Sequence, residues 1–133
     1  MGGDAVNHAK GGHITLTSTN GGASWTGINV SGEATMFGVH CLTTNTFVAC
    51  AGASTIYRTT NGGTTWTPNA IGTSTTTTLY DINFPTSAIG YAVGGSSTTS
   101  TATGGVVYKT MDAGITWVPA NTGLLPNTLY GVH

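Results

Sequence analysis

The segment Thr59-Thr60-Asn61-Gly62-Gly63-Thr64-Thr65-Trp66 decides the fold, because the chain contains this pattern three times. Each copy reads Ser/Thr-x-Asn/Asp-x-Gly-x-Ser/Thr-Trp, and the other two copies run from Ser18 to Trp25 and from Thr110 to Trp117. The three tryptophans are 41 and 51 residues apart. A motif that returns at such a spacing indicates a chain built from repeated supersecondary units.

A second element repeats in phase with the first. It starts with an apolar residue followed by an aromatic one, and its copies are residues 36–40, 79–83 and 129–133. The aromatic positions of the three copies, 37, 80 and 130, are 43 and 50 residues apart. Two independent markers therefore give one period of 41 to 51 residues, which is the size of a four-stranded propeller blade.

The strands of each unit follow from alternating residues between turn signals. The middle unit, about 35–70, is expected to hold strands near 35–42, 46–52, 54–59 and 64–70. The last unit, about 78–119, is expected to hold strands near 78–84, 88–95, 104–110 and 115–119. The first unit, about 4–30, lacks an innermost strand and is expected to hold strands near Ala5–Ala9, 13–18 and 24–30. An extra innermost strand is expected at 129–133.

The predicted fold is therefore an all-β propeller of four-stranded antiparallel blades, with about three blades in a single segment 1–133. The composition agrees, because the chain is rich in Thr, holds 21 Gly and has only 5% charged residues, and Thr favours strands while Gly supplies turns. Three blades are too few to close a ring, since propellers usually have about 4 to 8. We expect closure by another copy, or by further blades of a longer propeller.

The repeated motif is expected to form the turn between the last two strands of each blade. Its Asn or Asp can accept backbone hydrogen bonds within the turn, its glycine can adopt a positive φ, and its tryptophan can pack on the blade. The structural positions are accordingly Asn20, Gly22, Trp25, Asn61, Gly63, Trp66, Asp112, Gly114 and Trp117.

This motif resembles the Asp-box of BNR-like repeats, which occurs in sialidases, in sortilin-type receptors and in the photosystem II assembly factor Ycf48. The segments Ile89–Gly95 and Val107–Thr110 are most similar to the Ycf48 pattern. The resemblance implies a propeller, and the Ycf48 likeness implies an arginine-lined face that receives a segment of a membrane protein. This chain departs from that pattern, because Arg58 is its only arginine.

The acidic residues argue against an enzyme. A glycosidase needs two carboxylates about 5 to 9.5 Å apart, and the chain has only Asp4, Glu33, Asp81 and Asp112, of which Asp112 is assigned to a turn. We therefore expect no catalytic residues and a non-enzymatic binding or structural module that assembles by strand exchange between chains. The alternative is a fragment of a glycoside hydrolase or of a carbohydrate-binding propeller.

The candidate binding face lies on the loops that join blades and on the long segment 95–105, because an insertion in one repeat commonly marks a binding face. Its hydroxyl-rich, nearly uncharged surface would suit a glycan or another protein. The candidate residues are Glu33, Thr75, Thr76, Thr98, Thr99 and Thr101.

Other partners are excluded by composition. Binding to nucleic acid needs clustered basic residues, and the chain has three, well separated, with a net charge of −1. No apolar run is long enough to span a membrane. No cofactor and no metal is expected, since His40 and His133 read as equivalent positions of successive repeats. The surface of Thr, Ser, Asn and Gly suggests an extracellular or cell-surface protein.

Cys41 and Cys50 are expected in adjacent strands of the middle unit. They are interpreted either as small buried hydrophobic residues or as a cross-strand disulfide, which requires Cα atoms within about 7 Å.

Overall fold

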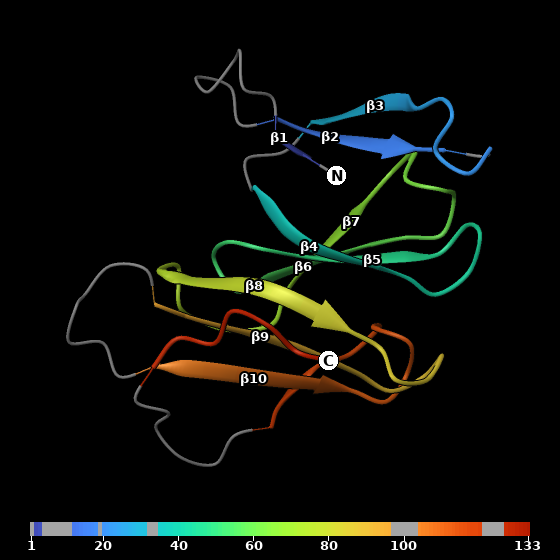
Figure 1. Cartoon of the computed structure of the whole chain (residues 1–133). Helices are drawn as coiled ribbons and strands as arrows, with labels where there is room; N and C mark the ends of the chain where they lie inside the picture. Colours follow the sequence, from blue (N-terminus) through green and yellow to red (C-terminus); the bar gives the residue numbers. More distant parts are fainter. Residues whose placement is uncertain (1, 4–11, 19, 32–34, 97–103, 121–126) are drawn as a thin grey trace.

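The computed structural model shows three antiparallel sheets that follow one another along the chain (Figure 1). It describes residues 2–3, 12–18, 20–31, 35–96, 104–120 and 127–133. All elements in this part of the chain are β-strands. The predicted all-β class, with antiparallel four-stranded blades, is confirmed.

The second sheet is a complete blade with strand order β4-β5-β6-β7. Its strands are β4 Met36–Cys41, β5 Phe47–Ala51, β6 Thr55–Thr59 and β7 Thr67–Ala70. The third sheet repeats this order with β8 Thr77–Asn83, β9 Gly90–Ser96, β10 Gly105–Thr110 and β11 Val118–Pro119.

The first sheet has three strands, β1 Gly2–Gly3, β2 Gly12–Thr17 and β3 Thr26–Ser31, in the order β1-β2-β3. The strand expected at Ala5–Ala9 lies outside the described residues. On the side of β2 away from β3, the paired strand is β1, in which Gly2 is opposite Ile14 and Gly3 is opposite His13.

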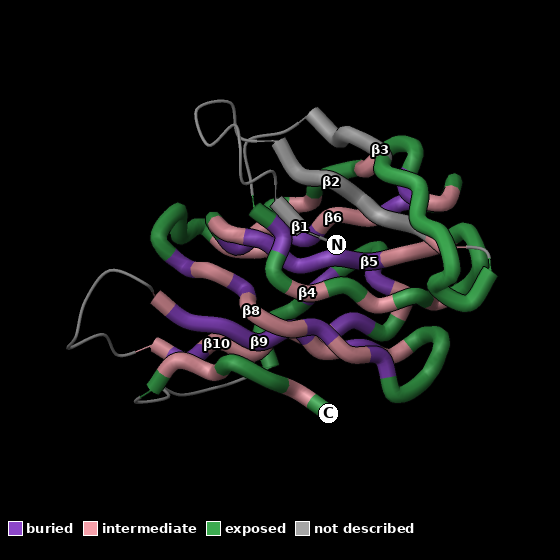
Figure 2. Tube along the Cα trace, turned by 45° about the horizontal axis from the view of Figure 1, so that its top comes forward, coloured by how far each residue is buried: buried purple, intermediate pink, exposed green. Residues whose placement is uncertain are grey.

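The main core fills the space between the second and third sheets. Val48 and Cys50 on β5 and Ile56 on β6 pack there with residues of β8 and β9. The alternate residues of β5, Ala49 and Ala51, join Met36 in a second cluster on the opposite face of the same sheet. Both faces of this sheet are therefore buried, and Figure 2 shows the buried positions concentrated on β5 and β9.

Equivalent bulges shape the innermost strands of both complete blades. The register of β4 against β5 shifts between Met36 and Gly38, and that of β8 against β9 shifts between Leu79 and Asp81. The extra residue at each bulge is the repeated aromatic, Phe37 or Tyr80. A bulge re-aims a side chain, and the two rings meet edge to face with centroids 5.5 Å apart.

Residues 129–133 form no strand within this chain, and the extra innermost strand expected there stays a prediction. An innermost strand is held by ladder hydrogen bonds to the second strand of its own blade. The segment nevertheless lies beside the third sheet (Figure 1), with the Leu129 N–H donating to the Gly94 carbonyl at 3.2 Å.

Candidate functional site

The three repeated motifs form the same hydrogen-bonded turn. In the second blade, Asn61 Oδ1 accepts from the backbone N–H of Thr65 at 3.0 Å, and Asn61 Nδ2 donates to Thr65 Oγ1 at 2.8 Å. Thr59 Oγ1 accepts from the N–H of Gly63 at 3.0 Å. The first blade repeats this pattern through Asn20 and Ser24. The Asn or Asp side chain of each turn therefore accepts a backbone hydrogen bond. In two of the three turns this side chain is an uncharged Asn.

The third turn has a carboxylate at the same place. Asp112 Oδ1 accepts from the N–H of Thr116 at 2.8 Å, and its Oδ2 accepts from the Thr116 hydroxyl at 2.5 Å. Hydrogen bonds to the ionised form lower a carboxyl pKa. Those from Thr116, with smaller contributions from Thr110 and Ile115, lower the pKa of Asp112 to about 2.

The motif glycines adopt the left-handed backbone that the turn requires, with φ of 89° at Gly22, 88° at Gly63 and 81° at Gly114. Gly114 also sits close to the preceding blade, since a β-carbon there would lie 3.1 Å from Cγ2 of Val48 on β5. The turn of the third blade thus packs directly on the second.

The motif tryptophans differ in burial. Trp117 is 8% exposed, its ring contacts Phe84, and its Nε1 donates to the Gly114 carbonyl. Trp66 is partly buried beside the cluster that contains Met36. Trp25 is 61% exposed, so its indole does not pack as the sequence predicted. A blade precedes Trp66 and Trp117, whereas none among the described residues precedes Trp25.

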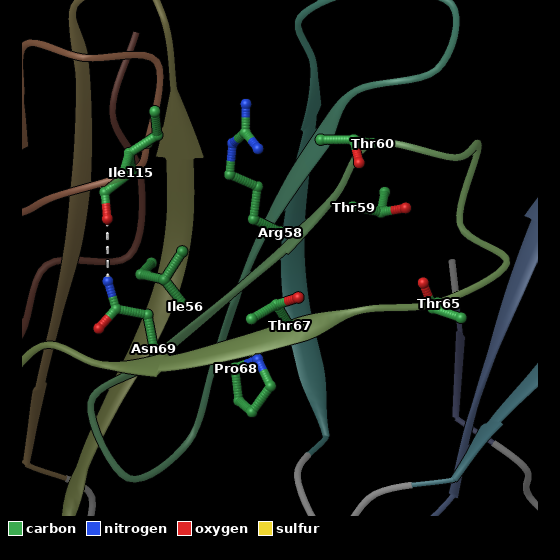
Figure 3. Close-up of a pocket in the computed structure, with 10 residues that line it drawn as sticks. Ile56, Arg58, Thr59, Thr60, Thr65, Thr67, Pro68, Asn69 and Ile115 are labelled. Carbon is green, nitrogen blue, oxygen red and sulfur yellow. Dashed lines mark hydrogen bonds between the residues drawn. The ribbon is translucent and has the colours of Figure 1, made fainter.

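A cavity of about 350 Å³ opens between the last two strands of the second blade and the turn of the third (Figure 3). Hydroxyl groups dominate its wall, together with one cation. Its lining residues are Ile56, Arg58, Thr59, Thr60, Thr65, Thr67, Pro68, Asn69, Gly114 and Ile115.

The cavity forms a groove between the two blades, and two side chains of the second blade donate hydrogen bonds across it to the turn of the third blade. Arg58 Nε donates to the Ala113 carbonyl at 3.2 Å, and Asn69 Nδ2 donates to the Ile115 carbonyl at 3.2 Å, as the dashed line in Figure 3 shows. The Arg58 guanidinium makes one hydrogen bond to the described residues, and its acceptor is the Ala113 carbonyl. Its two terminal nitrogens are therefore available to a ligand.

An aromatic row follows the innermost strands. Phe37 contacts Tyr80 at 5.5 Å, and Tyr80 contacts Tyr130 at 5.0 Å. Phe37 is 49% exposed and Tyr130 is 72% exposed, so both ends of the row remain open to solvent.

The sequence-predicted binding face is only partly described. Thr75 and Thr76 are exposed in the segment between β7 and β8, where the Thr76 N–H donates to Ser74 Oγ. Glu33, Thr98, Thr99 and Thr101 lie outside the described residues. This face stays a prediction.

The groove was missed by the sequence reasoning. Arg58 and Asn69 come from one blade and the carbonyls they bind from the next, so their proximity depends on how the blades pack. The sequence does hold a signal for the basic residue in the groove. A basic residue, Arg58 or Lys109, directly precedes the repeated turn motif in the second and third blades.

The two cysteines are free. Cys41 is opposite Phe47 and Cys50 is opposite Gly38 in the β4–β5 ladder, so the two thiols are not cross-strand partners and the disulfide interpretation is wrong. Burial raises the pKa of the Cys50 thiol to about 12.

The His40 ring contacts Phe84 at 5.2 Å. No group of three His, Cys, Asp or Glu residues in the described part of the chain is arranged to hold a metal ion. No helix in the described ranges has the length and hydropathy needed to cross a membrane.

Repeated blades, each with an Asn- or Asp-capped turn and a motif tryptophan, define an Asp-box propeller. Residues 2–99 match the family described as photosynthesis system II assembly factor YCF48. The chain belongs to this Ycf48 family. No protein among the curated sequences matches it.

A solved structure titled "YCF48 bound to D1 peptide" is similar to this chain, with a TM-score of 0.60 and 18% sequence identity. The match covers 83% of this chain and 33% of the other, so this chain spans about a third of that protein's length. At this identity the likeness shows the propeller fold.

The expectation of an extracellular or cell-surface protein is wrong. The family is described as an assembly factor of photosystem II, and the assembly of that complex does not take place outside the cell. The scarcity of charged residues misled the prediction, because it reflects the Thr- and Gly-rich repeats rather than a compartment.

Proposed function

We propose that this chain is a non-enzymatic protein-binding segment of a propeller, and that a peptide binds in the groove between its second and third blades. The observation that carries the proposal is the cavity of about 350 Å³ lined by Arg58. A cation whose terminal nitrogens are available at a concave site favours a ligand with a carboxylate.

The chemistry of the wall supports an extended peptide. Thr60 and Thr67 line the cavity, and their hydroxyls take part in no hydrogen bond among the described residues, so they can donate to peptide carbonyls. An acidic side chain or a terminal carboxylate would meet Arg58 in a bidentate pair. Ile56 and Pro68 supply apolar contact.

The family gives this proposal its context. A related protein has been solved with a D1 peptide, as its title states, and we propose a peptide of a photosystem II protein as the partner of this chain as well. This proposal reaches beyond the likeness itself, because the chain covers 33% of that protein.

The non-enzymatic assignment is supported by what the described carboxylates do. Asp81 accepts from the N–H groups of Ile82 and Val132, and Asp112 caps its turn through Thr116. Each acid therefore has a structural role.

Fluorescence anisotropy with a labelled D1 peptide tests the groove. We expect Arg58→Gln to weaken binding about tenfold or more, because hydrogen bonds to a charged group contribute about 1.5–3 kcal/mol. Lys109→Gln is the matched control, since it removes the same charge at the equivalent position of the third blade and should leave binding nearly unchanged.

Equal losses in both variants would indicate a general charge effect and would contradict the groove. Arg58→Gln also removes the bond to Ala113, so Thr67→Val serves as a second variant that leaves this bond in place. Binding of neutral glycans that Arg58→Gln does not alter would favour the carbohydrate-binding alternative.

We also propose that the chain associates with itself through residues 129–133, which would supply an innermost strand to another copy. Among the described residues the first sheet has three strands and the other two sheets have four, which supports this proposal. The exposed Thr75 and Thr76 remain a second proposed contact surface.

A further inference from the structure

The third Asp-box turn departs from the other two at the residue that follows its glycine. This residue is Ala23 in the first turn, Thr64 in the second and Ile115 in the third. A hydroxyl at this position takes part in the turn, since Thr64 Oγ1 donates to the Asn61 carbonyl at 3.0 Å. An isoleucine side chain makes no hydrogen bond, so the chemistry of the turn does not explain its presence.

Ile115 lies on the wall of the groove between the second and third blades. Its side chain is 59% exposed, although the strands and the turn on both sides of the groove are in place. This exposure therefore belongs to the groove and not to an end of the chain. An aliphatic side chain that is open inside a concave site gains free energy when a ligand covers it.

The backbone of Ile115 is fixed on both sides. Its N–H donates to Asp112 Oδ1 at 3.1 Å, and its carbonyl accepts from Asn69 Nδ2 at 3.2 Å. Isoleucine is also β-branched, which restricts its χ1 angle. A side chain that is already restricted loses little conformational entropy when a ligand packs on it, and this favours binding.

The cation and the aliphatic side chain lie at the same end of the groove. The Arg58 Nε donates to the carbonyl of Ala113, which is two residues before Ile115. Figure 3 shows the Arg58 guanidinium and the Ile115 side chain pointing in the same direction from opposite walls. A group that binds anions and an apolar surface are therefore neighbours.

We propose that the groove recognises a carboxylate with an aliphatic side chain next to it, and that Ile115 is the residue that determines this specificity. The inference rests on the peptide site proposed above and specifies its ligand. The carboxylate pairs with the terminal nitrogens of Arg58, and the aliphatic side chain packs on Ile115. The cavity of about 350 Å³ is near the lower end of the range of ligand pockets, so it accommodates a short segment of the peptide.

Fluorescence anisotropy with labelled, end-blocked peptides tests the ligand. The peptide Gly-Leu-Asp-Leu-Gly contains both groups, Gly-Ser-Asp-Ser-Gly lacks the aliphatic side chains, and Gly-Leu-Asn-Leu-Gly lacks the charge. We expect the first to bind about tenfold more tightly than either of the others.

A carboxylate at the end of a chain has the same chemistry as an acidic side chain. The peptide Gly-Gly-Gly-Leu, with a free carboxyl terminus and then with an amidated one, distinguishes the two sources. Tighter binding of the free acid assigns the site to a chain terminus, and tight binding of Gly-Leu-Asp-Leu-Gly assigns it to a side chain. Either result supports the inference.

Ile115→Thr tests the residue, because it introduces the side chain that the second turn has at position 64. We expect it to weaken binding of Gly-Leu-Asp-Leu-Gly about threefold to tenfold and to leave Gly-Ser-Asp-Ser-Gly nearly unchanged. Met111→Thr is the matched control. Met111 is an exposed apolar residue of the same turn, it is not among the groove residues, and the second turn has Thr60 at its position.

Thermal unfolding checks that each variant is folded, and Ile115→Val, with an expected loss of about twofold to threefold, replaces Ile115→Thr if that variant is not. Equal affinity of the wild type for the Leu and Ser peptides, with both weakened by Arg58→Gln, would overturn the role of Ile115 and leave the groove in place. An equal loss for both peptides in Ile115→Thr would also overturn it. Binding that Arg58→Gln does not alter, or no binding of any of these peptides, would overturn the groove itself.

Discussion

At the scale of single residues, the Asp-box turn depends on an acceptor more than on a charge. Asn20 and Asn61 each accept a backbone N–H through Oδ1 and donate through Nδ2 to a hydroxyl. Asp112 makes the same backbone contact, but its hydroxyl partner donates instead of accepting. The turn therefore tolerates either residue by reversing one hydrogen bond.

The charge of Asp112 should make the third blade sensitive to acid. Its folded pKa of about 2 lies below the ordinary value of 3.8, so its contribution to stability is present above about pH 4 and is lost as the pH falls towards 2. The difference in melting temperature between wild type and Asp112→Asn should therefore narrow between about pH 5 and about pH 2. Thermal unfolding followed by circular dichroism measures this difference.

The reciprocal variant provides the control. Asn61→Asp introduces a carboxylate with the same turn contacts and should acquire the pH dependence that Asp112→Asn loses. If the difference in melting temperature between wild type and Asp112→Asn stayed constant across this pH range, the stabilising role of the ionised Asp112 would be contradicted.

Much of the turn chemistry could be predicted from the sequence, because each motif contains its own donors, acceptors and glycine. Arg58 could not be assigned in this way, since its acceptor is the Ala113 carbonyl of another blade. The exposure of Trp25 was missed for the same reason. Tryptophan burial depends on the preceding blade, and the motif carries no information about that neighbour.

At the scale of elements, the strands were predictable because apolar alternation and turn residues are local signals. The bulges at Phe37 and Tyr80 were not, although they aim both rings at the same row. Residues 129–133 carry the pattern of an innermost strand, yet they form none. A strand requires a paired neighbour as well as a pattern.

The tight contact between β8 and β9 at Gly94 gives a prediction at this scale. A β-carbon at Gly94 would overlap the Thr78 carbonyl oxygen and lie 2.8 Å from the Leu79 Cα. Both neighbours are backbone atoms of β8, which cannot move without breaking the ladder. We expect Gly94→Ala to lower the free energy of unfolding by about 1–3 kcal/mol, measured by chemical denaturation.

Gly104→Ala is the matched control for this variant. A β-carbon at Gly104 meets nothing within 4 Å among the described residues, so the protein should keep its wild-type stability. Equal stability of the two variants would mean that β8 and β9 do not approach as closely as the structure shows.

At the scale of the whole molecule, the three sheets form part of a propeller, and a hydrophobic core joins the second and third blades. The same packing creates the groove, because the turn of one blade meets the last strands of the other. Core and proposed binding site therefore share one interface.

The most direct test of this account is a nuclear magnetic resonance titration of the ¹⁵N-labelled chain with the D1 peptide. The account predicts that the largest shifts of backbone amide signals fall on Thr59, Thr67 and Ile115, which line the groove. Shifts confined to Thr75 and Thr76, or to Phe37 and Tyr130, would place the peptide on the loop face or on the aromatic row. Either result would contradict the central claim that the groove between the second and third blades recognises the partner.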